Sequence, residues 1–482
     1  MKIFSIVILL LLLFPFKSIY PQKELIIDTD DMFICLSVRM DNNGDFVATC
    51  IRDSADYNFK GGVVKFNDAL QYEYYEPQND TAYFEFKDLI VTDDNNYLIA
   101  ATIGKNIGLW KHNHTIYLVL LNENLELIAE NFYELPEEND NPYLRLMQNT
   151  DGRIYLTIDE PSNFLKGTLE VSPNAEILKD KMYFGMGHPT LNPFPKSDGG
   201  LYLLRGNPVP WAFCGITEVD TCLNYGTTYL FPMEVNGIMY DMGTRGSCKW
   251  LNDTTYLLCS EGSLETETVD LHIYKINNHH EFLMEPLMIG HEYYDDIVPN
   301  YQSISWTDPQ RIYVVGSMQP SMNFKSTYYV AIINEDLELL GYKICGGDKN
   351  TWISGIIATP DGGCVMVGSQ RDYHAGNPLD GEGYIARFHP DEIITSAAET
   401  TNPYDSDYML FPNPGSDQLN IQTARKGVKI EMFDQTGRMV VQQKLNDEFR
   451  NHISIDNLPA GLHHCRLTDK QGYVENKKWI KQ

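Results

Sequence analysis

The segment IIATPDGGCVMVGSQ, residues 356–370, contains two short apolar runs separated by the turn sequence Pro360-Asp361-Gly362-Gly363. Two such runs joined by an Asp-Gly turn predict a β-hairpin, because glycine readily adopts the positive φ that tight antiparallel turns need. Related segments begin at residues 36, 89, 144, 191, 247, 304 and 356. Seven copies at regular spacing indicate a repeat protein.

Each repeat has room for two further strands. TIYLVLLNENLELIAE from Thr115 and TYYVAIINEDLELLGY from Thr327 both predict a third strand, a polar turn and a fourth strand. Four strands per repeat are typical of a propeller blade, and a ring of seven such units leaves no long exposed sheet edge. The sequence therefore predicts an all-β fold with a seven-bladed β-propeller body over residues 23–394.

Several alternatives stay open for the body. The same strands could form a β-sandwich or a solenoid, and six or eight blades are possible because residues 227–242, TTYLFPMEVNGIMYDM, are hard to assign. We expect residues 24–27, ELII, to close the ring as an extra strand of the last blade. Residues 359–391 resemble loosely defined bacterial propeller repeats, in which a DGG turn precedes a V-x-G-S strand and a Y-I-x-R/K-F strand. This resemblance concerns the fold and implies no activity.

The two ends of the chain differ from the body. Residues 1–22 begin with a basic residue, Lys2, ahead of an apolar run from Ile3 to Phe14, and this pattern predicts a cleaved signal peptide and not a membrane span. The whole chain has a net charge of -29, whereas residues 409–482 carry 11 basic and 8 acidic residues. Because the signal segment adds two lysines, the region between carries about -34. That region is expected to repel nucleic acid and anionic membranes.

The C-terminal residues read as a separate small module. After a polar linker over residues 395–408, short alternating strands joined by Gly and Pro turns predict a small Ig-like β-sandwich over residues 409–482. Its motifs occur in the order PNP, D-x-x-G-R, L-P-x-G and a basic end. The residues of these motifs are Pro412, Asn413, Pro414, Asp434, Gly437, Arg438, Pro459, Gly461 and Lys478.

This order of motifs closely resembles the C-terminal sorting domain of the type IX secretion system of Bacteroidetes. The resemblance implies a partner, the type IX secretion machinery, and a secreted or outer-surface location with no membrane span in the mature chain. It also implies that the module is usually removed after export. His463-His464-Cys465 departs from the aromatic-rich strand common in the family. An ordinary Ig-like accessory domain is the alternative interpretation.

The nine cysteines of an exported chain allow disulfides and leave at least one thiol unpaired. Cys35 and Cys50 flank one predicted hairpin turn symmetrically, and Cys248 and Cys259 flank another. We therefore expect these two pairs to be bonded, whereas Cys214 and Cys222 could close a short loop. Buried free thiols are the alternative. No C-x-x-C spacing indicates a zinc site.

The sequence contains no recognisable catalytic motif, metal site or cofactor site. His112, His114 and the pair His279-His280 read as solvated loop residues. Asp28 to Asp31, and the group of Asp41, Asn43 and Asp45, offer oxygens for calcium, but the second group forms a predicted hairpin turn and has no bidentate glutamate at the expected spacing.

Two functional classes remain for the body. The favoured one is a noncatalytic module that binds an unknown extracellular protein or glycan through loops 207–226 and 370–383, with Trp211 and Phe213 as candidate contacts. The other is a hydrolase or lyase acting on glycans, because propellers can hold carboxylates around a central funnel.

Overall fold

The computed structural model describes most of the chain between residues 23 and 481. The described residues are 23–27, 32–53, 59–77, 83–106, 112–135, 142–160, 165–184, 192–205, 214–231, 234–235, 238–239, 241–263, 269–290, 295–299, 302–319, 326–346, 349–371, 381–393, 408–411, 418–423, 426–446, 450–470 and 474–481.

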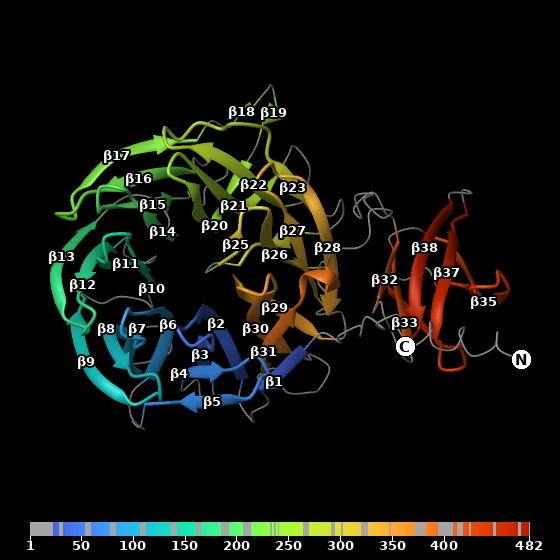
Figure 1. Ribbon diagram of the computed structural model, residues 1–482, viewed down its shortest axis with the longest axis horizontal. Helices are drawn as coiled ribbons and strands as arrows, with labels where there is room; N and C mark the ends of the chain where they lie inside the picture. The colour runs from blue at the N-terminus through green and yellow to red at the C-terminus, as the bar shows by residue number, and fades with distance from the viewer. Residues whose placement is uncertain are drawn as a thin grey trace, which may run out of the picture.

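Antiparallel sheets radiate from a common centre, so the body is a β-propeller (Figure 1). The described residues form seven such sheets, here called blades 1 to 7, each running from an inner to an outer strand. Blade 1 consists of β2 (Met32–Met40), β3 (Phe46–Asp53), β4 (Phe59–Phe66) and β5 (Tyr72–Tyr75), and blade 2 of β6 (Tyr83–Val91), β7 (Tyr97–Asn106), β8 (His112–Leu121) and β9 (Leu127–Glu134). Blade 3 consists of β10 (Tyr143–Gln148), β11 (Ile154–Glu160), β12 (Leu165–Val171) and β13 (Ile177–Phe184). Blade 4 consists of β14 (Asn192–Pro195), β15 (Leu201–Arg205), β16 (Gly215–Val219) and β17 (Tyr225–Leu230).

Blades 5 to 7 follow the same plan with small differences. Blade 5 consists of β20 (Asp241–Asn252), β21 (Thr255–Ser263), β22 (Asp270–Asn277) and β23 (Leu287–Ile289). Blade 6 consists of β24 (Asp295–Ile297) with β25 (Ile304–Asp308), β26 (Arg311–Gln319), β27 (Thr327–Ile333) and β28 (Leu339–Gly346). Blade 7 consists of β29 (Asn350–Ala358), β30 (Cys364–Arg371), β31 (Gly381–Phe388) and β1 (Lys23–Ile27). In blade 6 both β24 and β25 pair with β26, so its inner strand is interrupted.

The first strand of the chain closes the ring, as predicted. β1 pairs antiparallel with β31, and Leu25 lies opposite Ile385. Ile27 is buried with residues of both blade 7 and blade 1, including Val367 and Phe33. Closure therefore joins the two ends of the body through backbone hydrogen bonds and apolar packing.

The apolar core is divided into clusters that each join two neighbouring blades. One cluster packs Leu98 and Leu118 of blade 2 against Leu156 of blade 3. Six further clusters join the other adjacent pairs, including the last blade to the first. This cyclic packing rules out the alternatives of a single sandwich or an open solenoid. The unassigned stretch 227–242 contains most of β17, the start of β20 and a small hairpin of β18 (Glu234–Val235) and β19 (Ile238–Met239).

One five-residue turn is used throughout the described chain. Its first residue accepts a hydrogen bond from the N–H of the fourth and donates to the carbonyl of the fifth, and the fourth residue has a positive φ. This is a type I turn followed by a left-handed residue, the usual three-residue hairpin loop. It occurs at residues 41–45, 67–71, 92–96, 122–126, 149–153, 172–176, 196–200, 220–224, 277–281, 334–338, 359–363 and 434–438.

All of these turns except residues 434–438, which belong to the C-terminal module, lie at one end of the propeller. In an antiparallel blade, the turn between the first and second strands and the turn between the third and fourth strands lie at the same end, here called the turn end. The connections between the second and third strands, and those between blades, leave from the other end, here called the loop end. Glycines predicted to have a positive φ do so, with φ of 88° at Gly44, 85° at Gly152, 90° at Gly199 and 84° at Gly362.

The C-terminal module is a pair of packed sheets. One consists of β32 (Met409–Phe411), β33 (Gln418–Gln422) and β36 (Arg450–Ser454); the other consists of β35 (Met439–Lys444), β34 (Lys429–Phe433), β37 (Gly461–Thr468) and β38 (Val474–Lys481). Leu419 and Ile421 of the first sheet share a core with Ile430, Leu467 and Trp479 of the second. Tyr408, placed at the end of the predicted linker, is fully buried in this same core.

Candidate functional site

The D-x-x-G-R motif of the C-terminal module forms one of the five-residue turns. Asp434 Oδ1 accepts hydrogen bonds from the backbone N–H groups of Thr436 (2.9 Å) and Arg438 (3.0 Å). Its Oδ2 pairs with Arg438 Nε at 3.2 Å, and Gly437 has a φ of 80°. Hydrogen bonds to Asp434, first from Thr436, lower the pKa of that carboxyl. The motif residues therefore fix the hairpin between β34 and β35.

The remaining motif residues lie elsewhere in the module. Pro459 and Gly461 lead into β37, and the carbonyl of Pro459 lies 3.0 Å from His463 Nε2. Lys478 is exposed on β38, opposite His464. Pro412, Asn413 and Pro414 lie outside the described residues. The atypical strand residues His463 and Cys465 are both buried, and the His463 ring lies 5.7 Å from that of Trp479.

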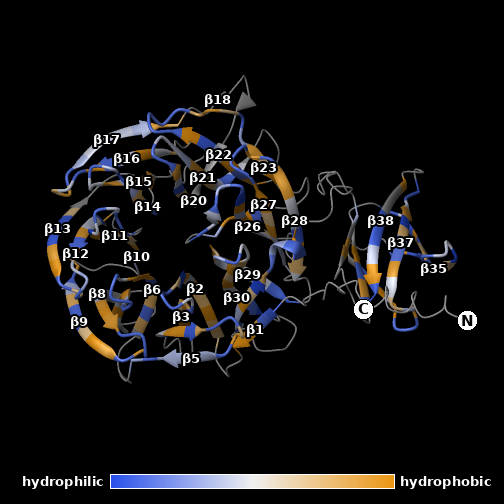
Figure 2. Cartoon of the chain, in the orientation of Figure 1, coloured by the Kyte–Doolittle hydropathy of each residue, from blue (hydrophilic) through white to orange (hydrophobic). Residues whose placement is uncertain are grey.

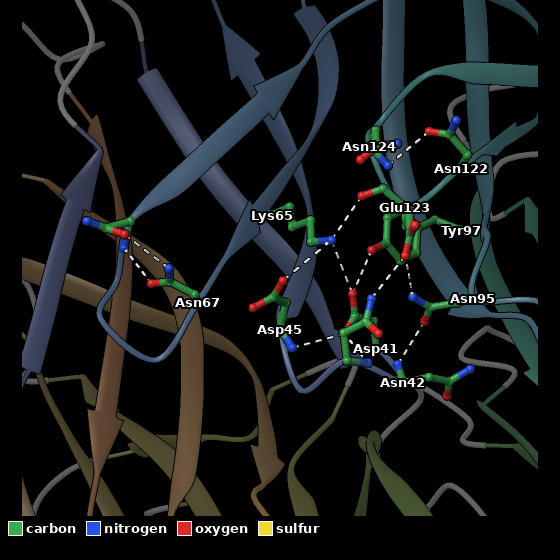
Figure 3. Close-up of polar contacts among 12 residues, drawn as sticks. Asp41, Asn42, Asp45, Lys65, Asn67, Asn95, Tyr97, Asn122, Glu123 and Asn124 are labelled. Carbon is green, nitrogen blue, oxygen red and sulfur yellow. Dashed lines mark hydrogen bonds and ion pairs between the residues drawn. The ribbon is translucent and has the colours of Figure 1, made fainter.

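At the turn end, polar side chains join blades 1 and 2 (Figure 3). Tyr97 donates a hydrogen bond to Asp41 Oδ2 at 2.8 Å, and Lys65 Nζ lies 3.3 Å from the same oxygen. Lys65 also donates to the carbonyl of Glu123 at 2.9 Å, while Asn42 N donates to Asn95 Oδ1 at 2.8 Å. Burial raises the pKa of Tyr97 to about 12, so its hydroxyl remains a donor to the Asp41 carboxylate.

The contacts around Asp41 bear on the calcium hypothesis. Asp41 Oδ1 accepts the backbone N–H groups of Asn43 and Asp45, both at 2.9 Å. With Tyr97 and Lys65 on its other oxygen, this carboxylate is surrounded by donors and not by further oxygen ligands. Among the described residues, no group of three or more His, Cys, Asp and Glu is arranged to hold a metal ion. Asp28 to Asp31 lie outside the described residues.

Inner strands are joined by a second series of polar contacts that sequence reasoning missed. Asp88 pairs with Arg39 of blade 1 at 3.2 Å and accepts the N–H of Leu146 of blade 3 at 2.9 Å. Arg145 Nε donates to Asn192 Oδ1 of blade 4 at 3.2 Å. The only available signal was that Asp88 interrupts the apolar pattern of its strand, and such an interruption does not reveal which neighbouring blade it contacts.

The loop end contains buried charged residues. Asp159 and Glu160, at the end of β11, are 2% and 0% exposed, and Asp296 on β24 is 0% exposed. Lys166 of β12, itself buried, lies directly opposite Asp159 in the sheet register. The candidate contacts Trp211 and Phe213 lie outside the described residues. The two predicted loops are shorter than expected, because residues 207–226 include β16 and residues 370–383 include the ends of β30 and β31.

The outer rim carries exposed apolar side chains. On β9, Leu127, Ile128 and Phe132 are 48%, 51% and 52% exposed, and this strand includes an apolar stretch at the rim (Figure 2). The Phe132 ring stacks on that of Tyr117 at 4.8 Å. Exposed apolar groups gathered in this way are candidate contacts for another macromolecule.

All nine cysteines are free thiols in the structure. Cys35 lies directly opposite Cys50 in the register of β2 and β3, but the expected disulfide between them is not formed. The expected pairing of Cys248 with Cys259 is wrong, because Cys248 lies opposite Leu258 and Cys259 lies opposite Ser247. A one-residue offset places the two side chains on opposite faces of the blade.

The pairing of Cys214 with Cys222 is also wrong. These residues flank the five-residue strand β16, with Cys214 buried at one end and Cys222 exposed in the turn at the other. A strand of that length separates them by roughly 17 Å, well beyond the reach of a disulfide. Burial raises the pKa of Cys214 to about 12, as it does for Cys35.

The histidines differ from their expected solvated state. His112 and His114 belong to strand β8 and not to a connecting loop. His279 is exposed, whereas His280 is only 6% exposed and its Nδ1 lies 3.0 Å from Tyr256 Oη. Burial lowers the pKa of His280 to about 4, with a smaller contribution from His279. Burial also lowers the pKa of Lys249, a residue not singled out from the sequence, to about 8; its Nζ donates to the carbonyl of Trp306 at 2.8 Å.

Comparison with protein families identifies the class of the C-terminal module. Residues 409–482 match the family described as the secretion system C-terminal sorting domain. The chain is a cargo protein of the type IX secretion system with a β-propeller body, and it is secreted or displayed at the cell surface. The sorting domain implies the type IX machinery as a partner. Within the described residues, no helix is long and apolar enough to cross a membrane.

The other comparisons concern the fold alone. Solved structures similar to this chain include a fungal alcohol oxidase in complex with copper (10% identity, TM-score 0.45, covering 95% of this chain and 98% of that one). They also include the β-propeller domain of the Trilobed protease from Pyrococcus furiosus (13% identity, TM-score 0.41, covering 78% of this chain and 98% of that one). A third is an ulvan lyase of a polysaccharide lyase family (8% identity, TM-score 0.45, covering 76% of this chain and 95% of that one). At these values no activity is transferable. A search of curated proteins finds no match.

Proposed function

We propose that the propeller body is a noncatalytic module that binds an extracellular protein or glycan at its loop end after export. The main support is the difference between the two ends of the ring. At the turn end, polar side chains such as Asp41, Lys65 and Asn95 are engaged in contacts between blades. The connections that leave from the loop end differ in length and sequence, as expected of a recognition surface.

Two connections of the loop end contain the best contact residues. Residues 206–213, GNPVPWAF, and 372–380, DYHAGNPLD, combine aromatic rings with amides and carboxylates. Aromatic rings stack on sugar rings and on apolar protein groups, while the polar groups provide directional hydrogen bonds. Trp211 and Phe213 are the proposed contacts, and the rim residues of β9 are a secondary surface.

The test is a glycan array and a panel of extracellular matrix proteins probed with the purified full-length chain. The change of both Trp211 and Phe213 to alanine should reduce binding to any hit by at least about tenfold, which corresponds to roughly 1.4 kcal/mol. The matched control is Tyr72→Ala and Tyr74→Ala on the exposed outer strand β5, which should leave binding unchanged. Equal binding by the loop variant would contradict the proposed surface.

A glycan hydrolase or lyase is the second candidate, because Asp159, Glu160 and Asp296 are buried carboxyl groups on strand ends that face the loop end. Buried carboxyl groups are the chemical requirement of acid-base glycan cleavage. Product analysis after incubation with each glycan that binds separates the two classes. Cleavage lost in Asp159→Asn or Asp296→Asn, with binding retained, would replace the binding-module proposal.

Export itself is tested by deletion. Removal of residues 410–482 should retain the body in the periplasm in a folded state, because body and module have separate strand sets and separate cores. Secretion that persists after the deletion would contradict the assigned role of the module. The proposed division is a signal peptide over 1–22, a body over 23–394, a linker over 395–408 and a sorting domain over 409–482.

A further inference from the structure

The sorting domain has one sheet face whose chemistry the export role does not yet explain. In the four-stranded sheet, Ile430, Met432, Cys465 and Leu467 are buried in the module core. Because side chains alternate along a strand, the residues between them point to the opposite face. That face is made of side chains from β34, β35, β37 and β38, and we call it the basic face. The residues that matter here are Lys429, Glu431, Phe433, Met439, Gln442, Lys444, His464, Arg466, Val474 and Lys478.

The strand register brings these side chains into rows. Lys429 lies opposite Lys444, and Glu431 lies opposite Arg466. His464 lies between Phe433 on one neighbouring strand and Lys478 on the other. Three lysines and one arginine, at positions 429, 444, 478 and 466, therefore share this face with one acidic residue, Glu431. Lys444, His464, Arg466 and Lys478 are exposed.

The single acid is already paired within the face. Glu431 Oε1 accepts hydrogen bonds from Lys429 Nζ at 2.6 Å and from Gln442 Nε2 at 3.0 Å. These contacts, with the nearby charge of Arg466, lower the pKa of Glu431 and keep it ionised. It therefore offsets Lys429, and the charges of Lys444, Arg466 and Lys478 set the sign of the surface.

Apolar groups lie among the cations. The Arg466 guanidinium is 5.5 Å from the centre of the Phe433 ring, and Met439 is 48% exposed. Val474, which begins β38, is also 48% exposed. Arginine, methionine and aromatic residues are the types enriched in the cores of protein interfaces, whereas a surface kept only for solubility shows lysine and glutamate without exposed apolar groups.

We infer that the basic face is the surface by which the sorting domain docks onto an acidic protein surface of the type IX machinery. The inference rests on the export role of the module and adds to it which face is recognised and by what chemistry. Opposite charge would speed and orient the encounter, while Phe433, Met439 and Val474 would be buried on contact. The D-x-x-G-R turn has a structural role instead, because its residues form hydrogen bonds and an ion pair with one another and stabilise the hairpin.

The experiment measures export of the full-length chain from cells with an active type IX system. Arg466→Glu combined with Lys478→Glu should lower export by about tenfold or more, since the encounter becomes repulsive. The charge-keeping pair Arg466→Lys with Lys478→Arg should be exported normally. The matched control, Lys426→Glu with Lys470→Glu, makes the same change in net charge at exposed turn positions that are not among the basic-face residues, and it should also be exported normally.

Folding and partner class are checked in the same cells. The variant with Arg466→Glu and Lys478→Glu must keep the thermal unfolding midpoint of the native chain. If its midpoint falls, the neutral variant with Arg466→Gln and Lys478→Gln replaces it, and this variant too must keep the native midpoint while its export falls. Normal export of a charge-reversed, folded variant would overturn the inference while leaving the effect of deleting 410–482 intact. Normal export with loss of surface retention would also overturn it, because the face would then bind an anionic glycolipid.

Discussion

The two sets of turns at the turn end have the same backbone and different residues. Between first and second strands, the position of positive φ is occupied by Gly44, Asn95, Gly152, Gly199 and Gly362. Between third and fourth strands, it is occupied by Leu70, Leu125, Ala175, Leu223, His280 and Leu337. Residues with a side chain cost roughly 1–2 kcal/mol in this conformation, although asparagine adopts it more readily than others. The second set therefore accepts strain that the glycines of the first set avoid.

Packing between blades explains the difference. Leu223 is fully buried with Tyr155 and Leu203, and Leu337 is 5% exposed in the cluster of blades 5 and 6. The left-handed backbone turns these side chains back toward the core, so burial of the side chain offsets the strain. In the first set the space beside Gly44 and Gly152 is open, and a side chain there would gain no contact.

The largest effect is expected at Leu223. Leu223→Ala should lower the free energy of unfolding by about 3 kcal/mol, because it leaves a cavity in the core between blades 3 and 4. Leu223→Gly should be about 1 kcal/mol more stable than Leu223→Ala, because glycine removes the backbone strain. Chemical denaturation of both variants measures the order.

Leu169 is the matched control for this order. It is equally buried but lies within strand β12. There the glycine variant should be less stable than the alanine variant. The same order at both positions would show that the strain at Leu223 has no energetic consequence.

The second test uses His280, the one titratable residue at the positive-φ position of the turns between third and fourth strands. Its pKa is about 4 in the folded state against 6.5 for an ordinary histidine, so the unfolded state binds the proton more tightly. The contribution of His280 to stability should therefore be complete above pH 6.5 and fall by roughly 2 kcal/mol as the pH falls to 4. His280→Leu should flatten this slope in denaturation series between pH 4 and 7.

Two features complete the design of the pH experiment. His272, whose pKa burial also lowers to about 4, remains in both proteins and leaves a residual slope. Exposed His279 is the control, and His279→Gln should keep the native slope. An unchanged slope in His280→Leu would contradict the assigned role of its burial.

A smaller effect is expected at the first position of the same turns. Asn122 Oδ1 accepts the N–H groups of Asn124 and Glu126, both at 2.9 Å. Asn122→Ala should cost about 1–2 kcal/mol, because both donors lose their protein partner. Asn124→Ala, in the same turn, keeps both acceptor bonds and should change the unfolding midpoint little.

The smallest effect is expected in the glycine set. Gly152→Ala should cost about 1 kcal/mol, since no heavy atom lies within 4 Å of the added carbon and only the φ of 85° opposes it. Gly437→Ala in the sorting domain has the same environment and should cost about the same. The control is Gly355→Ala, where the backbone is not left-handed and the new contacts are of ordinary length, so no loss is expected.

Much of the fold could be predicted because its signals are local. The hairpin pattern at residues 356–370 predicted the strands of blade 7, and the order of turn motifs after residue 409 predicted the sorting domain. The cysteine predictions were less successful. Cys35 lies opposite Cys50 because the register of β2 and β3 shifts between Cys35 and Val38, whereas a shift between Trp250 and Asn252 moves Cys248 out of line with Cys259. Spacing about a turn does not encode such shifts.

By itself the sequence determined the all-β class, the strand that closes the ring and the sorting domain, because periodicity, turn glycines and motif order depend on neighbouring residues. Only the tertiary structure decided which blade each side chain contacts. Asp88 bonds to blades 1 and 3, Leu223 enters a core between two blades, and the basic face assembles from four strands. These contacts join residues far apart in the chain, so their energies depend on register and burial that local sequence does not encode.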